Sequence, residues 1–172
     1  DLISPLEVRS ETFAEGDASG NNSGDEDQKF DRIRSILSNE IENGLVEVER
    51  DGDKIIMRLG QQDSFDSGRS EIKSSFEATL RKVGLALNDV GGMVKIEGHT
   101  DSVPVGFSSR YRSNWDLSSA RSASVADYIL ESTDLQPGNV SVAGFADSRP
   151  IASNDTPEGR ARNRRIEVLV DG

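Results

Sequence analysis

The 172-residue chain holds 34% hydrophobic and 30% charged residues, with a formal net charge of −11. Its length allows one well-packed core, and its acidity excludes a nucleic-acid-binding role, which needs a basic stripe. The chain has no cysteine and one histidine, which excludes disulfides and cysteine-based zinc sites.

The acidity is concentrated at the start of the chain. Residues 1–28 hold eight acidic side chains against Arg9, a net charge of −7, so the other 144 residues carry −4. The first residues are rich in Gly, Ser and Asn and have little to bury. We therefore expect a flexible acidic linker over residues 1–27 and a folded domain over residues 28–172.

The chain starts at Asp1 and lacks an initiator methionine. It also lacks an apolar run of the roughly 20 residues needed to span a bilayer. We expect a fragment or processed form whose targeting or membrane segments lie outside this sequence.

Apolar residues at helical spacing predict a first helix from Gln28 to a stop at residues 43–44. This helix either packs on its own subunit or extends as a mobile lever. Two β-rich runs, 45–50 and 53–59, follow and are joined by Asp51-Gly52, which predicts a hairpin.

A second helix is predicted from an apolar face over residues 72–87, and a third over residues 114–131. Strands are predicted at residues 93–98, 140–144 and 165–170, and the segments 63–69, 102–112 and 146–163 are expected to be loops. Helices interleaved with strands behind a hairpin indicate an α/β two-layer sandwich with helices covering one sheet face.

A carboxylate and a guanidinium occupy notable positions in the second half of the chain. Asp101 leaves the expected strand at the end where α/β sheets commonly hold ligands. Arg121 interrupts an apolar helix face, so its charge reaches solvent or meets an anion. Two interpretations are open. The two side chains form a salt bridge that braces loop and helix, or they grip a ligand that carries an amine and a carboxylate.

Neighbouring polar residues support similar alternatives. Ser113 and Asp116 form a capping box, and Asn114 behind it caps the helix or presents its amide to a ligand. His99 is expected to hydrogen bond at the strand end, and no metal site is predicted. Trp115 is expected to anchor the core or a loop.

The basic cluster of residues 159–165 is either a solvated turn or an anion-recognising rim beside Asp101 and Arg121. Side chains alternate along a strand, so Arg164 shares a side with Ile166 while Arg165 faces the other way. We expect one of these two arginines to be partly buried and paired.

Enzyme signatures such as a nucleophile elbow, a phosphate-binding loop or a metal-ligand cluster are missing from the sequence. Glu97 and Asp101 could form an acid/base pair for glycoside cleavage, but two acids near a strand end are common. We predict a protein without enzymatic activity or cofactor.

Three motifs occur in order within residues 93–170. They are Gly98-His99-Thr100-Asp101, Leu117-Ser118-x-x-Arg121-Ser122 and Gly159-Arg160-x-x-Asn163-Arg164-Arg165-Ile166-Glu167. In this combination the chain resembles the OmpA-like peptidoglycan-binding domain. The resemblance implies a mixed sheet covered by helices, with an extra N-terminal helix here. It also implies that Asp101 takes the amine and Arg121 the carboxylate of diaminopimelate in the peptidoglycan stem peptide. Asn114 and Arg164 are secondary ligand-binding candidates, and Thr100, His99 and Asn163 are candidate structural supports.

Within that family, the lengthened loop and Ser113-Asn114-Trp115-Asp116-Leu117-Ser118 are most similar to the flagellar motor stator B subunits, MotB and PomB. This resemblance implies a periplasmic homodimer, held in the inner membrane by a segment absent here. It further implies a MotA/PomA-type partner and a role in anchoring the ion-driven motor to the cell wall. The alternatives are a wall anchor of another OmpA-like envelope protein (Pal or OmpA type) and a dimerising structural spacer.

Overall fold

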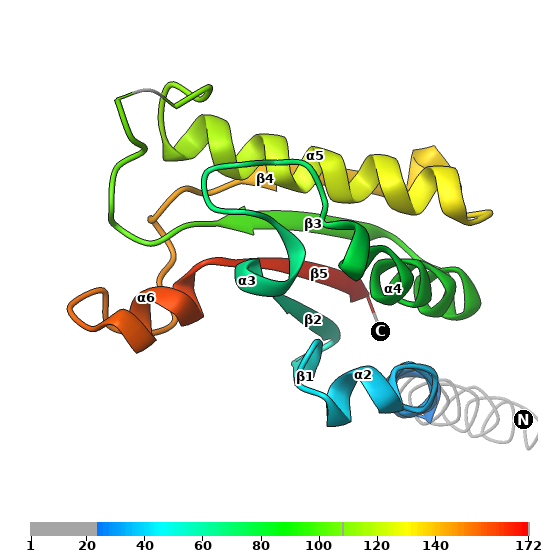
Figure 1. Cartoon of the computed structure of the whole chain (residues 1–172). Coiled ribbons are helices and arrows are strands. Elements are labelled where there is room, and N and C mark those ends of the chain that lie inside the picture. Colours follow the sequence, from blue (N-terminus) through cyan, green and yellow to red (C-terminus); the bar gives the residue numbers. More distant parts are fainter. Residues whose placement is uncertain (1–23, 108, 172) are drawn as a thin grey trace, which may run out of the picture.

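The computed structural model describes residues 24–107 and 109–171, which form one mixed sheet with helices packed on one face (Figure 1). The strands are β1 (Glu47–Asp51), β2 (Lys54–Gly60), β3 (Val94–His99), β4 (Val140–Gly144) and β5 (Arg165–Asp171). A helix over residues 24–36 is followed by α2 (Ser38–Glu42), α3 (Gln61–Ser64), α4 (Glu77–Val90), α5 (Asn114–Ser132) and α6 (Pro157–Asn163). Short 3₁₀ turns occupy Ser74–Phe76 and Pro137–Asn139. The expected two-layer α/β sandwich with a mixed sheet is confirmed.

The strand order places the last strand in the middle of the sheet. The order is β1-β2-β5-β3-β4, and all neighbouring pairs are antiparallel except β3 and β4. A parallel pair needs a long crossover, which α5 supplies between β3 and β4. Because β5 lies beside β3, its first residue Arg165 pairs with His99. The basic cluster before β5 is therefore brought next to Thr100 and Asp101.

Alternation along the strands separates an apolar face from a charged one. Toward the helices, the sheet presents buried Ile and Val from β3 and β5 and Ile55, Met57 and Leu59 from β2. These pack with Leu80, Val83 and Leu87 of α4 and with Val125 and Ile129 of α5 in one core. The opposite face of β3 and β5 carries Lys95, Glu97, His99, Arg165 and Glu167.

The glycine of the Gly98-His99-Thr100-Asp101 motif lets α5 approach β3 closely. A Cβ at Gly98 would lie 2.1 Å from the carbonyl oxygen of Ser118, a backbone atom of α5 that cannot swing aside. This tight crossing fixes the start of α5, and hence Arg121, relative to the end of β3.

The N-terminal helix packs on its own domain. Ile33 and Leu37 are fully buried in the core, and Arg32 forms a 2.7 Å ion pair with Asp89 of α4. The helix begins at residue 24, four residues before the expected start. Residues 1–23 of the expected linker lie outside the described residues. Within the described part of the chain, no helix combines the length and apolar character that a membrane span requires.

Two of the expected loops contain short helices. The segment 63–69 begins inside α3, and the segment 146–163 contains α6, whose N-cap Thr156 accepts a hydrogen bond from the Gly159 amide. Trp115 is 55% exposed, so of its two expected roles, anchoring the core or a loop, the first was wrong. It lies in the first turn of α5, whereas Leu117, two residues later, is buried and lines the cleft described below.

Candidate functional site

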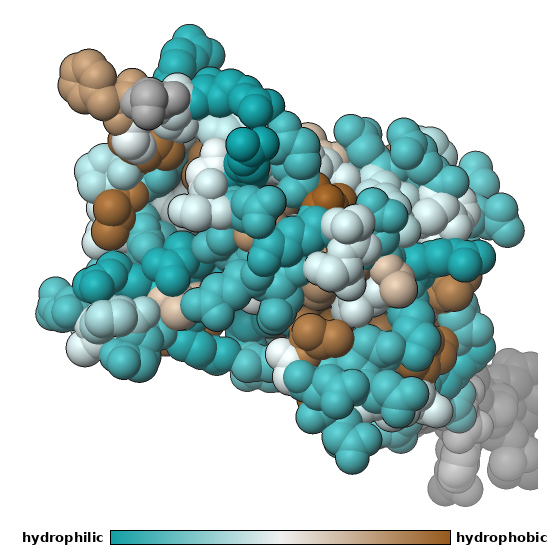
Figure 2. Space-filling view, in the orientation of Figure 1, coloured by the Kyte–Doolittle hydropathy of each residue, from teal (hydrophilic) through white to brown (hydrophobic). Residues whose placement is uncertain are grey.

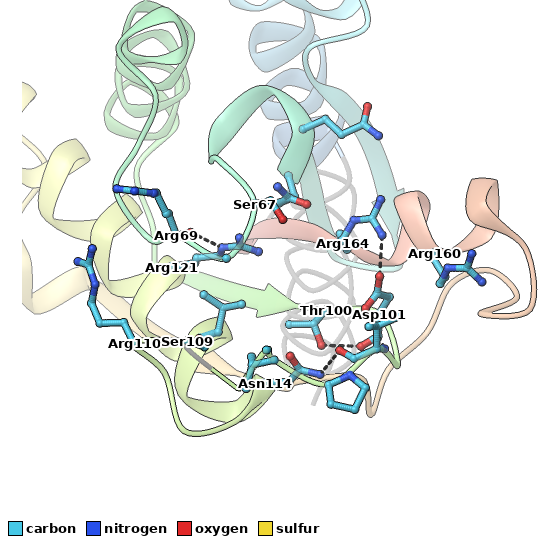
Figure 3. Close-up of a pocket in the computed structure, with 18 residues that line it drawn as sticks. Ser67, Arg69, Thr100, Asp101, Ser109, Arg110, Asn114, Arg121, Arg160 and Arg164 are labelled. Atoms are coloured by element: carbon cyan, nitrogen blue, oxygen red, sulfur yellow. Dashed lines mark hydrogen bonds and ion pairs between the residues drawn. The ribbon is translucent and has the colours of Figure 1, made fainter.

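An open cleft of about 930 Å³ lies beyond the end of β3. Its walls come from three parts of the chain that are distant in sequence: residues 61–69, residues 100–121 and α6 (Figure 3). Five of the sequence-predicted candidates line it: Thr100, Asp101, Asn114, Arg121 and Arg164. Figure 2 shows the surrounding surface as largely hydrophilic, with a few apolar side chains over the loop of residues 102–107.

Asp101 is held by two hydrogen bonds, and neither comes from Arg121. Its Oδ2 accepts a 2.6 Å bond from Arg164 Nη1, and its Oδ1 accepts a 3.0 Å bond from the Val103 amide. The carboxylate is buried while Arg164 is partly exposed. The interpretation of Asp101 and Arg121 as a mutual salt bridge does not hold, because α6 ends directly beside Asp101 and places Arg164 there instead.

Arg121 is buried without a carboxylate partner among the described residues. Only 5% of it is exposed, and its Nε donates a 2.8 Å hydrogen bond to the carbonyl of Arg69. A longer contact of 3.4 Å reaches the Asp66 carbonyl, and the guanidinium lies 5.1 Å from the centre of the Phe65 ring. These neutral partners satisfy donors without balancing the charge.

Burial lowers the pKa of Arg121 to about 10. The charges of Tyr111 and Asp101 act in the opposite direction, and that of Arg164 adds to the lowering. The side chain remains a cation at neutral pH but is poorly compensated. It therefore favours a ligand that carries a negative charge.

The cleft is strongly basic. Five arginines and one acid line it: Arg69, Arg110, Arg121, Arg160, Arg164 and Asp101. Arg110 also pairs with Glu71 at 2.7 Å, outside the lining. The sequence reasoning missed Arg69 and Arg110, which come from loops without a periodic pattern. From the basic cluster, Arg160 and Arg164 line the cleft, and its expected role as an anion-recognising rim stays a prediction.

Two further candidates hold the loop after β3. Asn114 Nδ2 donates a 3.0 Å hydrogen bond to the Val103 carbonyl, while Ser113 rather than Asn114 caps α5 by accepting from the Asp116 amide. Thr100 is buried and donates through its hydroxyl to the Asp101 carbonyl at 2.8 Å. Both residues fix the backbone that carries Asp101.

Asn163 is fully buried and organises the loop that precedes α6. Its Oδ1 accepts from the amides of Ile151 and Ala152 at 2.8 and 2.9 Å. Its Nδ2 donates to the Ala152 carbonyl and to Asn154 Oδ1, at 2.9 and 2.8 Å. Through these four contacts Asn163 sets the position of α6 and therefore of the arginines on it.

His99 lies on the opposite face of the sheet from the cleft. Its Nε2 lies 3.2 Å from Glu97 Oε1, and its ring stacks on Phe145 with centroids 5.4 Å apart. It lines a separate cavity of about 490 Å³ together with Glu97, Arg165 and Glu167. Since Glu97 faces this cavity and Asp101 the cleft, the two acids do not flank a common substrate position.

Glu97, His99 and Glu167 bring potential metal-ligand atoms within 4.8 Å of one another. Cations already occupy both carboxylates: Lys95 approaches Glu97 at 3.2 Å, and Arg165 and Arg58 approach Glu167 at 2.8 and 3.0 Å. A metal ion would have to displace these partners. The arrangement is thus a buried ion network. It was missed in the sequence because its members come from β3 and β5, whose pairing is not evident from local sequence.

The chain is similar to several bacterial proteins of known sequence. It is 28% identical over 145 residues to the uncharacterized protein YtxE of Bacillus subtilis, covering 84% of this chain and 60% of that protein. It is 35% identical over 108 residues to Motility protein B of the same organism, covering 62% of this chain and 41% of that protein. The chain thus spans less than two thirds of either relative.

A solved structure titled the cell wall anchor of the T6SS from Pseudomonas aeruginosa superposes with a TM-score of 0.76 and 34% identity. The match covers 81% of this chain and 96% of that one. The sequence pattern of the OmpA family matches residues 64–164, the segment that contains the whole cleft apart from residues 61 and 62. The chain therefore belongs to the OmpA family.

Proposed function

We propose that this domain binds peptidoglycan without cleaving it, by holding the diamino acid of the stem peptide in the cleft. The observation that carries this proposal is Arg121, a buried cation beside an open cleft that has only carbonyl and aromatic partners among the described residues. A ligand carboxylate would supply the missing charge through bidentate hydrogen bonds.

Asp101 would bind the amine of the same ligand. Each of its oxygens accepts one protein hydrogen bond, from Val103 and Arg164 respectively, so acceptor positions remain for an ammonium group. Arg164 then acts as an orienting partner of Asp101 and shares it with the amine. Asn114 supports the same loop through Val103.

The relatives support two candidate settings for this activity. The similarity to Motility protein B supports a stator role, in which a periplasmic homodimer anchors an ion-driven motor to the wall through a MotA/PomA-type partner and a membrane segment outside this chain. The T6SS cell wall anchor favours a second candidate, the anchor of another envelope assembly, because its similarity covers nearly all of that chain.

Sedimentation with purified peptidoglycan sacculi tests the shared activity. The wild-type domain should pellet with sacculi, whereas Arg121→Gln and Asp101→Asn should remain largely in the supernatant. Arg81→Gln is the matched control, because Arg81 is exposed on α4 and does not line the cleft. Near-identical pelleting of Arg121→Gln and wild type would refute the assigned site.

The same incubation separates the remaining alternatives. If the domain is a dimerising spacer, the wild-type protein itself should stay in the supernatant and should self-associate as its concentration rises. A hydrolase would release soluble muropeptides, which we do not expect because Glu97 and Asp101 face different cavities. Complementation of a strain that lacks the full-length protein, scored for swimming in soft agar, distinguishes a stator from another wall anchor.

A further inference from the structure

The cleft carries more positive charge than the proposed diamino acid can balance. Arg164 already neutralises Asp101, and Arg110 pairs with Glu71. Arg69, Arg121 and Arg160 have no carboxylate within 4.0 Å among the residues the structure describes. An amine and a carboxylate on one ligand cancel each other, so a zwitterionic group alone leaves this excess unchanged.

The excess charge is divided between two ends of the cleft. Arg121 and Arg69 meet at one end, where the Arg121 Nε bonds to the Arg69 carbonyl. Arg160 and Arg164 lie one helical turn apart at the other, since the Arg164 amide donates to the Arg160 carbonyl at 3.1 Å. Figure 3 shows Asp101 beside the second pair, with Arg121 and Arg69 on the far side. A carboxylate bound at Arg121 therefore leaves the end near Arg160 for another anion.

Arg160 is oriented for this role by the loop before α6. Its Nη1 donates a 2.9 Å hydrogen bond to the Asn154 carbonyl, and the side chain of Asn154 is in turn held by the fully buried Asn163. A guanidinium offers five N–H donors in a fixed plane, and this bond uses one. The others remain for a planar acceptor such as a carboxylate.

We propose that Arg160 forms a second carboxylate subsite and makes the domain selective for stem peptides whose glutamate α-carboxylate is free. The inference rests on the proposed function and specifies its ligand. In a stem peptide the diamino acid follows a γ-linked glutamate, whose α-carboxylate is free unless the cell amidates it. With the diamino acid at Arg121 and Asp101, this neighbouring carboxylate is the group that Arg160 binds.

Titration calorimetry with two synthetic tripeptides tests the proposal. Both contain L-alanine, a γ-linked D-glutamate and diaminopimelate, and they differ only in whether the glutamate α-carboxylate is free or amidated. Wild type should bind the free acid about three- to tenfold more tightly, as expected for one partly exposed charged contact. Arg160→Gln should bind both peptides equally, and Arg160→Lys should keep part of the preference.

Arg162→Gln is the matched control, because Arg162 lies on the same helix but pairs with Glu47 at the surface and does not line the cleft. It should keep the wild-type preference. Equal binding of the two peptides by wild type, or an unchanged preference in a folded Arg160→Gln, would overturn the second subsite alone. Failure of wild type to bind either peptide or sacculi would overturn the proposed function as well.

Discussion

Arg121 and Arg165 are equally buried, each 5% exposed, yet their surroundings differ in kind. Arg165 lies on the charged face of the sheet and forms a 2.8 Å ion pair with Glu167, which Arg58 also contacts. Arg121 lies at the cleft and contacts backbone carbonyls and an aromatic ring. Burial lowers the pKa of both guanidiniums, but only Arg165 has a carboxylate that raises it again by a direct hydrogen bond.

The difference supports the proposal that Arg165 is a structural cation and Arg121 a ligand-binding one. A buried charge needs a partner. Glu167 is that partner for Arg165, whereas Arg121 has no carboxylate partner among the residues that the structure describes. A site that lacks its counter-ion until the ligand arrives contributes little to stability and more to binding. The comparison therefore predicts that mutations on the charged sheet face lower stability, whereas mutation of Arg121 in the cleft mainly lowers binding.

The largest effect is expected for Glu167→Ala on the charged face. Removing this carboxylate leaves Arg165 and Arg58 without their shared partner, one of them buried. The free energy of unfolding should fall by about 3 kcal/mol, measured by urea denaturation. The control Glu47→Ala removes an exposed partner of Arg162 and should cost less than about 1 kcal/mol. Equal losses in the two variants would mean that the ion network is not structural.

Low pH should reduce the stability that the charged sheet face contributes. Burial opposes ionisation of Glu97 and Glu167, but hydrogen bonds from His99 and Lys95 to Glu97, and from Arg165 to Glu167, leave both pKa values below the ordinary 4.5. These carboxylates therefore contribute stability that is complete above about pH 4.5 and is lost as the pH falls through the lower pKa of the folded state.

Urea denaturation curves recorded at pH 6, 4.5 and 3 check this expectation. The free energy of unfolding should change little between pH 6 and pH 4.5 and be lower at pH 3. The decrease should be roughly 1.4 kcal/mol for each unit by which the pKa of a glutamate is lower in the folded than in the unfolded state. Glu47→Gln should follow the wild-type profile. A midpoint that stays constant down to pH 3 would contradict the role given to the two glutamates.

Sequence patterns predicted the helices and strands better than the contacts between their side chains. The long helices and the strands were predictable because apolar residues recur at helical or alternating spacing over many positions. The helices α3 and α6, four and seven residues long, lack such a repeat and were expected to be loops. Trp115 was misplaced because its residue type suggests burial, whereas its position in the first turn of α5 leaves it exposed.

The candidate site shows the same limit at the level of single residues. Asp101 and Arg121 could be selected from local motifs, and both line the cleft. Their partners could not, because the pairing of Asp101 with Arg164 depends on β5 entering the sheet beside β3. Local sequence carries no record of that strand order. For the same reason the network of Glu97, His99 and Glu167 was not predicted.

Arg164→Gln is expected to lower stability less than Glu167→Ala does. This change removes a 2.6 Å ion pair from buried Asp101, but Arg164 itself is 28% exposed and water can replace it in part. The free energy of unfolding should fall by about 1 kcal/mol in urea denaturation, less than for Glu167→Ala. A loss as large as that of Glu167→Ala would show that the cleft also holds a structural ion pair. The contrast between the two faces would then be confined to Arg121.

Arg121→Met should change stability least and binding most. Burial disfavours the cation in the folded state, so below its pKa of about 10 the charge opposes folding, and an apolar side chain of similar length removes that cost. The hydrogen bond to the Arg69 carbonyl is lost, which works in the other direction. We expect the free energy of unfolding to stay within about 1 kcal/mol of wild type, while pelleting with sacculi is abolished. Both are measurable on one preparation. A loss of 3 kcal/mol or more would identify Arg121 as a brace like Arg165, because a cation that awaits its ligand cannot be essential to the unliganded fold.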